Sequence, residues 1–171
     1  PAPAASASPS SVRGLATPAR QQTATAVPAE LGAEYTDPDG WFTLRYPEGW
    51  REHASGSEMQ FWADRQGDIA VAVSIQVKAL SADALADQFV SFLGEKWDGY
   101  EVASRETTTL SGLPAVWVEQ SWSWSGAAQR GALVAVVRNR MGVLLLTWCP
   151  EGDYADMEPD LRATVESLAL A

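Results

Sequence analysis

Residues 35–50 read Tyr-Thr-Asp-Pro-Asp-Gly-Trp-Phe-Thr-Leu-Arg-Tyr-Pro-Glu-Gly-Trp, and this stretch decides the fold. Its first part, residues 37–40, predicts a turn, because proline presets φ and glycine accepts a positive φ. A strand follows at residues 41–46, where apolar side chains alternate with others. Pro47 ends the pairing of this strand, since proline has no N–H to donate. The next turn then directs Trp50 towards the core.

Downstream of this stretch, apolar alternation or unbroken apolar runs predict six further strands, at residues 58–63, 69–77, 100–110, 113–124, 127–138 and 143–149. The last two lack clean alternation, so they belong in the middle of a sheet that is covered on both faces. Residues 100–110 are polar on both faces, which is typical of a strand near a sheet edge. Residues 51–56 form a polar loop in this interpretation.

Two segments predict helices. Ser81 is a good N-cap, and an apolar stripe at helical spacing follows from Leu85 to Leu93. Small side chains on the second face of residues 69–77 should let a helix pack closely. Residues 157–168 repeat the helical spacing and should pack back onto the sheet. The predicted fold is therefore α+β: a predominantly antiparallel, twisted sheet flanked by helices on both faces, an α/β/α sandwich, with strand ends rather than a deep cleft available for function.

Composition divides the chain into residues 1–30, predicted to be a disordered tether, and residues 31–171, predicted to be one globular domain. Ala, Pro, Ser and Thr fill 21 of the first 29 positions, and no aromatic residue occurs there. Such a tether typically follows a removed signal peptide or a lipid-anchored N-terminus, which predicts an extracytoplasmic protein: at the cell surface, periplasmic or secreted. The formal net charge of −10 and the scattered basic residues argue against nucleic acid or an anionic membrane as partner. No run is long enough to insert into a membrane.

The sequence offers no catalytic constellation. Cys149 is the only cysteine and lies in an apolar run, so a buried, inert thiol is the favoured interpretation. His53 is the only histidine and lies in a polar segment, which favours a surface position over a catalytic base. Residues 37–40 resemble the opening of a calcium loop but lack its later glutamate. We therefore expect no catalytic residue, no metal site and no cofactor.

Two pairs of residues are candidates for binding. Trp122 and Trp124 alternate with serines at the end of a strand beside a turn, and they are interpreted either as core residues or as an exposed aromatic shelf. Asp153 and Asp156 belong to the acidic segment 151–166, which is either a solvated helix face or a docking patch for a basic partner or a weak Ca²⁺ site.

A longer pattern connects several of these segments. It consists of Gly40-Trp-Phe-x-Leu-x-Tyr-Pro-x-Gly-Trp50, the turn Leu110-Ser-Gly-Leu-Pro-Ala115, and a closing segment from Pro150-Glu-x-x-Tyr154 to Ser167-Leu168. This pattern resembles the PsbP family, which comprises the extrinsic subunit of photosystem II and many bacterial relatives, lipoproteins among them. The resemblance covers about residues 35–169 and implies a PsbP-like sandwich without a catalytic group. No segment matches the photosystem-docking region, so a photosynthetic role is not implied.

Two classes of function remain. The first is a non-catalytic, extracytoplasmic binding or assembly-accessory domain with a protein partner. The second is a small-ligand or carbohydrate-binding module that uses Trp122 and Trp124, and a hydrolase is a distant third. A pocket with convergent polar groups beside these indoles would favour a ligand, whereas a flat apolar patch would favour a protein.

The predicted tether yields a direct test. Proteolytic removal of residues 1–30 should leave the midpoint of thermal unfolding of the remainder unchanged, because a segment with few large apolar side chains and no aromatic residue contributes little buried surface. Calorimetry of the intact and trimmed chains compares the two midpoints. A fall of several degrees on trimming would show that the segment packs on the domain.

Overall fold

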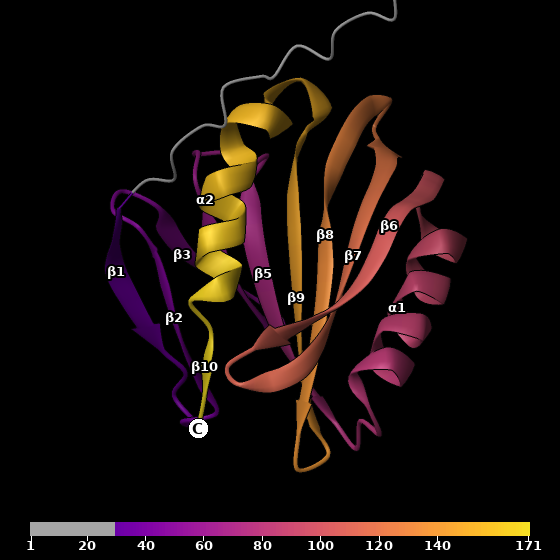
Figure 1. Cartoon of the computed structure of the whole chain (residues 1–171). Helices are drawn as coiled ribbons and strands as arrows, with labels where there is room; N and C mark the ends of the chain where they lie inside the picture. Colours follow the sequence, from indigo (N-terminus) through magenta and orange to yellow (C-terminus); the bar gives the residue numbers. More distant parts are fainter. Residues whose placement is uncertain (1–29) are drawn as a thin grey trace, which may run out of the picture.

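The computed structural model describes residues 30–171, which form two antiparallel sheets and two α-helices (Figure 1). The predicted tether, residues 1–30, lies outside the described residues apart from Glu30, so the division of the chain at this point stays a prediction. The elements, in chain order, are β1 (Leu31–Thr36), β2 (Phe42–Pro47), β3 (Arg51–Ser55), β4 (Glu58–Trp62), β5 (Ala70–Val77), α1 (Ala82–Lys96), β6 (Asp98–Leu110), β7 (Leu113–Trp124), β8 (Ala127–Arg138), β9 (Met141–Pro150), the short 3₁₀ helix η1 (Glu151–Asp153), α2 (Tyr154–Glu166) and β10 (Ala169–Leu170).

The large sheet has seven strands in the order β3-β4-β5-β9-β8-β7-β6. The apolar strands β8 and β9 occupy its middle and β6 forms one edge, as the sequence predicts. The opposite edge corrects the interpretation of residues 51–56, because Arg51–Ser55 is not a loop but the strand β3, paired with β4. All five of its side chains are exposed. An edge strand without a buried face leaves no apolar alternation in the sequence, so its polar composition resembles that of a loop.

The stretch that opens the fold lies in a second, smaller sheet rather than in the large one. This sheet has the order β1-β2-β10, and neither β1 nor β10 is predicted from the sequence. The hydroxyl of Ser167, which follows α2, accepts a hydrogen bond from the Arg45 amide at 2.8 Å. Ser111, in the β6–β7 turn, accepts one from the Leu170 amide at 2.9 Å. The three segments that carry the family resemblance therefore meet around β2 and β10.

One face of the large sheet is covered by α2 together with the small sheet, as Figure 1 shows. Phe61, Leu44 and Val165 have no exposed surface in this layer, and the rings of Tyr46 and Phe61 lie 4.9 Å apart. Trp50 is only partly buried at the margin of this core, so the turn before it delivers the indole to the edge of the core rather than to its centre.

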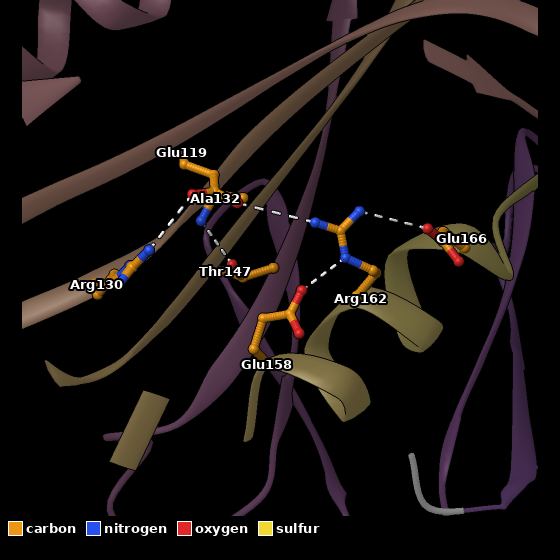
Figure 2. A network of polar contacts seen from close by, with 7 residues as sticks. All are labelled: Glu119, Arg130, Ala132, Thr147, Glu158, Arg162 and Glu166. Atoms are coloured by element: carbon orange, nitrogen blue, oxygen red, sulfur yellow. Dashed lines mark hydrogen bonds and ion pairs between the residues drawn. The ribbon is translucent and has the colours of Figure 1, made fainter. Parts of the chain in front are cut away.

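A polar network fixes α2 on this face (Figure 2). Arg162 of α2 pairs with Glu158 at 2.6 Å and with Glu119 of β7 at 3.9 Å. Its guanidinium also lies 4.3 Å from the centre of the Trp117 ring. The positive charge of Arg162 is thus neutralised by a carboxylate of α2 and by one of the large sheet. Together with the contact to the Trp117 ring, these ion pairs favour one rotation of α2 about its axis.

The other face of the large sheet is covered by α1. Ser81 caps this helix as predicted, because its hydroxyl accepts a hydrogen bond from the Ala84 amide at 3.1 Å. Arg105 of β6 pairs with Asp87 at 2.7 Å and with Asp83 at 3.1 Å, which ties the outer side of the helix to the sheet edge. The fold is therefore α+β with helices on both faces, as predicted.

Cover by α1 is incomplete. The helix packs on β6, β7, β8 and β9, and its buried side chains form one apolar cluster with residues of β7–β9. The small side chains of β5, Ala72 and Ser74, were expected to receive a helix, but instead they line an open cavity. Both side chains are nevertheless buried, so this face of β5 is covered, as predicted, but not by close packing of a helix.

The ladder between β8 and β9 is irregular at Gly131. The Ala132 amide donates to the side-chain hydroxyl of Thr147 at 2.8 Å (Figure 2), and a Cβ atom added at Gly131 would lie 1.9 Å from the Thr147 carbonyl oxygen. Only glycine permits this close backbone approach.

Gly131→Ala should therefore lower the free energy of unfolding by at least about 2 kcal/mol, because the two central strands must separate to accommodate the methyl group. Gly152→Ala is the matched control, since nothing lies within 4 Å of its Cβ position. Chemical denaturation compares the two variants. Equal free energies of unfolding for the two variants would show that β8 and β9 accommodate the added methyl group without loss of stability.

Candidate functional site

A cavity of about 530 Å³ lies on the α1 face of the large sheet, beside the C-terminal half of α1. Its floor is formed by β4, β5, β9, β8 and β7, and its wall by Phe89, Phe92 and Leu93 of the helix. The cavity thus occupies the part of the sheet that α1 does not cover. The sequence indicates strand ends rather than a deep cleft, and the structure adds this cavity as a candidate site.

Four of the eight tryptophans of the chain line this one cavity: Trp97, Trp122, Trp124 and Trp148. Trp97 ends α1, where its amide donates to the Leu93 carbonyl, and its ring stacks on Trp122 at 4.5 Å between centroids and 26° between planes. The Trp148 indole N–H donates to the Gly67 carbonyl at 2.7 Å. These contacts hold three of the four rings in fixed orientations.

Trp124 is the exception, because 59% of its surface is exposed while only 6% of Trp122 is. The two indoles share a face, as their spacing predicts, but they do not form the shelf of two exposed rings. Trp122 is a core residue held under Trp97, and Trp124 stands free at the mouth of the cavity. A ligand at this mouth meets an indole that has no stacking partner among the described residues.

Polar groups converge on the same cavity from several strands. Glu58 and Gln60 reach it from β4, Ser74 from β5 and Gln129 from β8. The Gln60 side-chain oxygen accepts the Trp62 indole N–H at 2.8 Å, so its amide N–H groups remain available. Carboxylate, amide and hydroxyl groups thus surround an otherwise aromatic and aliphatic surface.

A buried polar pair lies next to the stacked indoles. The Tyr100 hydroxyl donates to the Gln120 side-chain oxygen at 2.7 Å, and burial raises the pKa of Tyr100. Gln120 has no exposed surface, and its amide nitrogen has no hydrogen-bond partner among the described residues. The pair joins β6 to β7 behind Trp97, whose ring lies 6.3 Å from that of Tyr100.

The rim of the cavity opposite α1 is a structured turn between β4 and β5. The Asp64 carboxylate accepts hydrogen bonds from the amides of Gly67 at 3.0 Å and of Gln66 and Ile69 at 3.3 Å. Gly67 has a φ of +79°, and a Cβ atom there would lie 2.8 Å from the Trp62 ring. The turn is thereby held in the shape that presents the Gly67 carbonyl to Trp148.

Asp153 and Asp156, the other predicted pair, do not line this cavity. Both are exposed at the start of α2, on the opposite face of the large sheet. Of the two predicted pairs, only the tryptophans therefore line the cavity. Within residues 30–171, no three His, Cys, Asp or Glu side chains gather in a way that would hold a metal ion.

Trp97, Trp148 and the phenylalanines of α1 were missed as site residues. Trp97 and Trp148 are 51 positions apart and give no local signal beyond the excess of tryptophan. That excess by itself indicates core residues, because the position of α1 over the sheet is not visible in the sequence.

Cys149 and His53 lie on opposite faces of the large sheet. Cys149 is fully buried in the α2-side core, whereas His53 is exposed and stacks on Trp62 at 4.1 Å. Burial, followed by the negative charges of Asp153 and Asp64, raises the pKa of the Cys149 thiol to about 12. At neutral pH the thiol is protonated, so it does not act as a nucleophile.

Neither a protein-family model nor a curated protein sequence matches the chain. Solved structures do match it. Cyanobacterial PsbP (CyanoP) from Synechocystis sp. PCC 6803 aligns with a TM-score of 0.65 and 13% identity, over 88% of this chain and 96% of that protein. The chain has a PsbP-like fold. The resemblance seen in the turn motifs is confirmed at this level.

Two other proteins share the PsbP-like fold. LpqN of Mycobacterium tuberculosis, described as involved in cell envelope biogenesis, matches with a TM-score of 0.59 and 14% identity, over 81% of this chain and 90% of LpqN. A Pseudomonas aeruginosa protein of unknown function matches with a TM-score of 0.57 and 17% identity, over 81% and 96%. At such identities the similarity defines the fold alone. No helix within residues 30–171 is long and apolar enough to cross a membrane.

The raised pKa of Cys149 predicts an unreactive thiol. At pH 8 only about one molecule in 10⁴ carries the thiolate, so a disulfide reagent should label the denatured chain at once and the native chain hardly at all. The unfolded thiol ionises near 9.0, so this group should reduce stability by up to about 1.4 kcal/mol per pH unit as pH rises from 9 towards 12. Cys149→Ala should lack that component of the alkaline loss. A variant with the same alkaline loss as the parent would show that the thiol is not desolvated.

Proposed function

We propose that this protein is a non-catalytic, extracytoplasmic binding domain that holds a carbohydrate in the cavity beside α1. The observation that carries the proposal is the gathering of four indoles and several amide or carboxylate side chains around one cavity of about 530 Å³. Sugar rings present apolar C–H faces that stack on aromatic rings, and hydroxyl edges that bond to amides and carboxylates. The lining supplies both kinds of group.

Trp124 is the indole that a sugar ring would stack on. The other three rings are packed or hydrogen-bonded, whereas Trp124 is exposed beside the Ser125-Gly126 turn. An exposed indole on a strand end costs little conformational entropy to immobilise, because two rigid strands already fix its backbone. The ligand would replace the missing stacking partner of Trp124.

Gln60 and Gln129 would contact the hydroxyl edge of the sugar. They line the cavity from β4 and β8, which are three strand spacings apart, so each would contact a different part of a bound oligosaccharide. Glu58 adds an acceptor, and Lys96 of α1 adds a donor. Such paired amides distinguish a sugar from a purely apolar ligand, which would leave them unsatisfied.

Three observations support a binding role without catalysis, outside the cytoplasm. The single thiol, Cys149, is buried and its pKa is raised. The single histidine, His53, lies on the face of the large sheet opposite to Cys149 and stacks on Trp62. LpqN, which shares the fold, is described as involved in cell envelope biogenesis. The composition of residues 1–30 agrees with an extracytoplasmic tether.

A protein partner is the second candidate, because the mouth of the cavity is exposed and apolar. Phe92 of α1 and Trp124 of β7 flank it with 51% and 59% of their surfaces exposed. A partner that inserts one side chain between them would bury both rings. This is the assembly-accessory function that the family resemblance implies.

Carbohydrate binding is tested by following the indole N–H signals in NMR spectra while soluble cello-, malto- and chito-oligosaccharides are added. The signals of Trp97, Trp122, Trp124 and Trp148 should shift, and that of Trp117 on the other face should not. Trp124→Ala should weaken binding about tenfold, as expected for the loss of one stacked ring. Trp41→Ala is the matched control, because it removes an exposed indole far from this cavity.

Equal weakening of oligosaccharide binding by both substitutions would show that the sugars bind exposed indoles non-specifically. If no oligosaccharide shifts the four signals, the carbohydrate proposal fails and the protein partner becomes the favoured candidate.

A further inference from the structure

A second cavity, of about 520 Å³, lies at the end of the large sheet where β5 ends and the β8–β9 turn reverses the chain. Figure 1 places this turn at the bottom of the view, where β10 and the marked C-terminus also lie. The side chains of Lys78, Arg138 and Arg140 line the cavity with Trp41, 44% of whose surface is exposed. This cavity is separate from the aromatic one and plays no part in the function proposed above.

The charge of this cavity is opposite to that of the chain. The protein has a net charge of −10 and only 12 basic residues, yet three of them converge here from positions 60 residues apart in the sequence. No aspartate or glutamate is among the described residues that line the cavity, and the one negative group there is the main-chain carboxylate of Ala171, the last residue of the sequence. Within residues 30–171, none of the three cations forms an ion pair with a carboxylate. The sequence alone suggested scattered basic residues, and the fold assembles this cluster.

The backbone at two of these cations is strained. Lys78 has a φ of +66° and Arg140 a φ of +65°, in the left-handed region that side chains with a Cβ atom disfavour. The β8–β9 turn is one of three hairpin turns in the described chain whose two central residues both have positive φ. The other two, Ser111-Gly112 and Ser125-Gly126, place glycine second, as this turn type prefers, whereas Asn139-Arg140 places arginine there. A protein with glycine at position 140 would be more stable than this protein with arginine there.

The two strained cations lie at the same end of the β5–β9 ladder. Val77 pairs with Met141 at the end of the β5–β9 ladder, and Lys78 and Arg140 each lie one residue beyond that pair. Strained backbone and unpaired like charges at one cavity indicate a site kept for a ligand rather than for stability.

We propose that this cavity is an anion site for a phosphate group carried by a small organic molecule. Three cations suit a group with two negative charges, which a phosphate monoester carries near neutral pH. Arg138 already donates one hydrogen bond to the Leu170 carbonyl at 2.9 Å, which fixes its guanidinium while its other donors stay free. Trp41, Ile75 and Met141 supply an apolar wall for the organic part of the ligand.

The test is a titration of the full chain with inorganic phosphate, followed by backbone amide NMR at constant ionic strength with chloride as the balancing ion. Saturable shifts are expected at Lys78 and at residues 138–141. Arg140→Gly and Lys78→Gly should each weaken phosphate binding about three- to tenfold, the effect of one lost charge contact. Both should also raise the midpoint of thermal unfolding, because glycine relieves the left-handed strain. The variants are thus expected to fold, so lost binding is interpretable.

Arg65→Ala is the matched control. It removes one exposed positive charge from the turn that precedes β5, at the opposite end of that strand from Lys78. The affinity for inorganic phosphate should therefore stay unchanged. Unchanged affinity in Arg140→Gly, or phosphate shifts no larger than those with chloride alone, would overturn the proposal. Co-sedimentation with vesicles of phosphatidylglycerol, compared with phosphatidylcholine, identifies the source of the phosphate. If the chain binds the phosphatidylglycerol vesicles and Arg140→Gly weakens that binding, the phosphate belongs to a lipid headgroup. If the chain binds inorganic phosphate but not the vesicles, the ligand is a soluble molecule.

Discussion

The structure depends on one constraint: a seven-stranded sheet with two apolar faces needs cover on both. On one face, α2 and the small sheet cooperate. On the other, only α1 is present, and a helix of 15 residues is about 22 Å long and about 10 Å wide, whereas seven strands extend over about 29 Å. One helix therefore cannot cover the face. The uncovered part is lined with small, polar and aromatic side chains, and this is where the first cavity lies.

The sequence predicted the parts of this arrangement that local chemistry determines. Ser81 predicts the start of α1, because its hydroxyl caps a free backbone amide. The sequences of β8 and β9 predict central strands, because strands buried on both faces must be apolar throughout. The strands β1, β3 and β10 were missed because their partners, not their own residues, make them strands. The two-residue pairing of β10 with β2 has no local pattern at all.

The candidate site was predicted only in part, for a related reason. Trp122 and Trp124 have identical local settings, and their spacing places them on one face. Their exposure differs because Trp97 arrives from the end of α1 and stacks on Trp122 alone. The cationic cavity was invisible for the same reason, since Lys78 meets Arg140 only through the pairing of β5 with β9. The proteins of similar fold are 13–17% identical to this chain, so such faces can differ while the fold stays the same.

The hydroxyl of Ser167 and the two residues of β10 have a consequence for how the chain acquires its structure. They join the strand β2, which is more than 120 positions earlier, so the small sheet is complete only after the last turn of α2 has been made. While the chain is being synthesised, β2 has one neighbour and an open edge that has no partner yet. Contacts this distant in sequence make folding slow and leave the nascent chain dependent on being kept from pairing with other chains. The protein therefore reaches its native state as a late, whole-chain event rather than segment by segment.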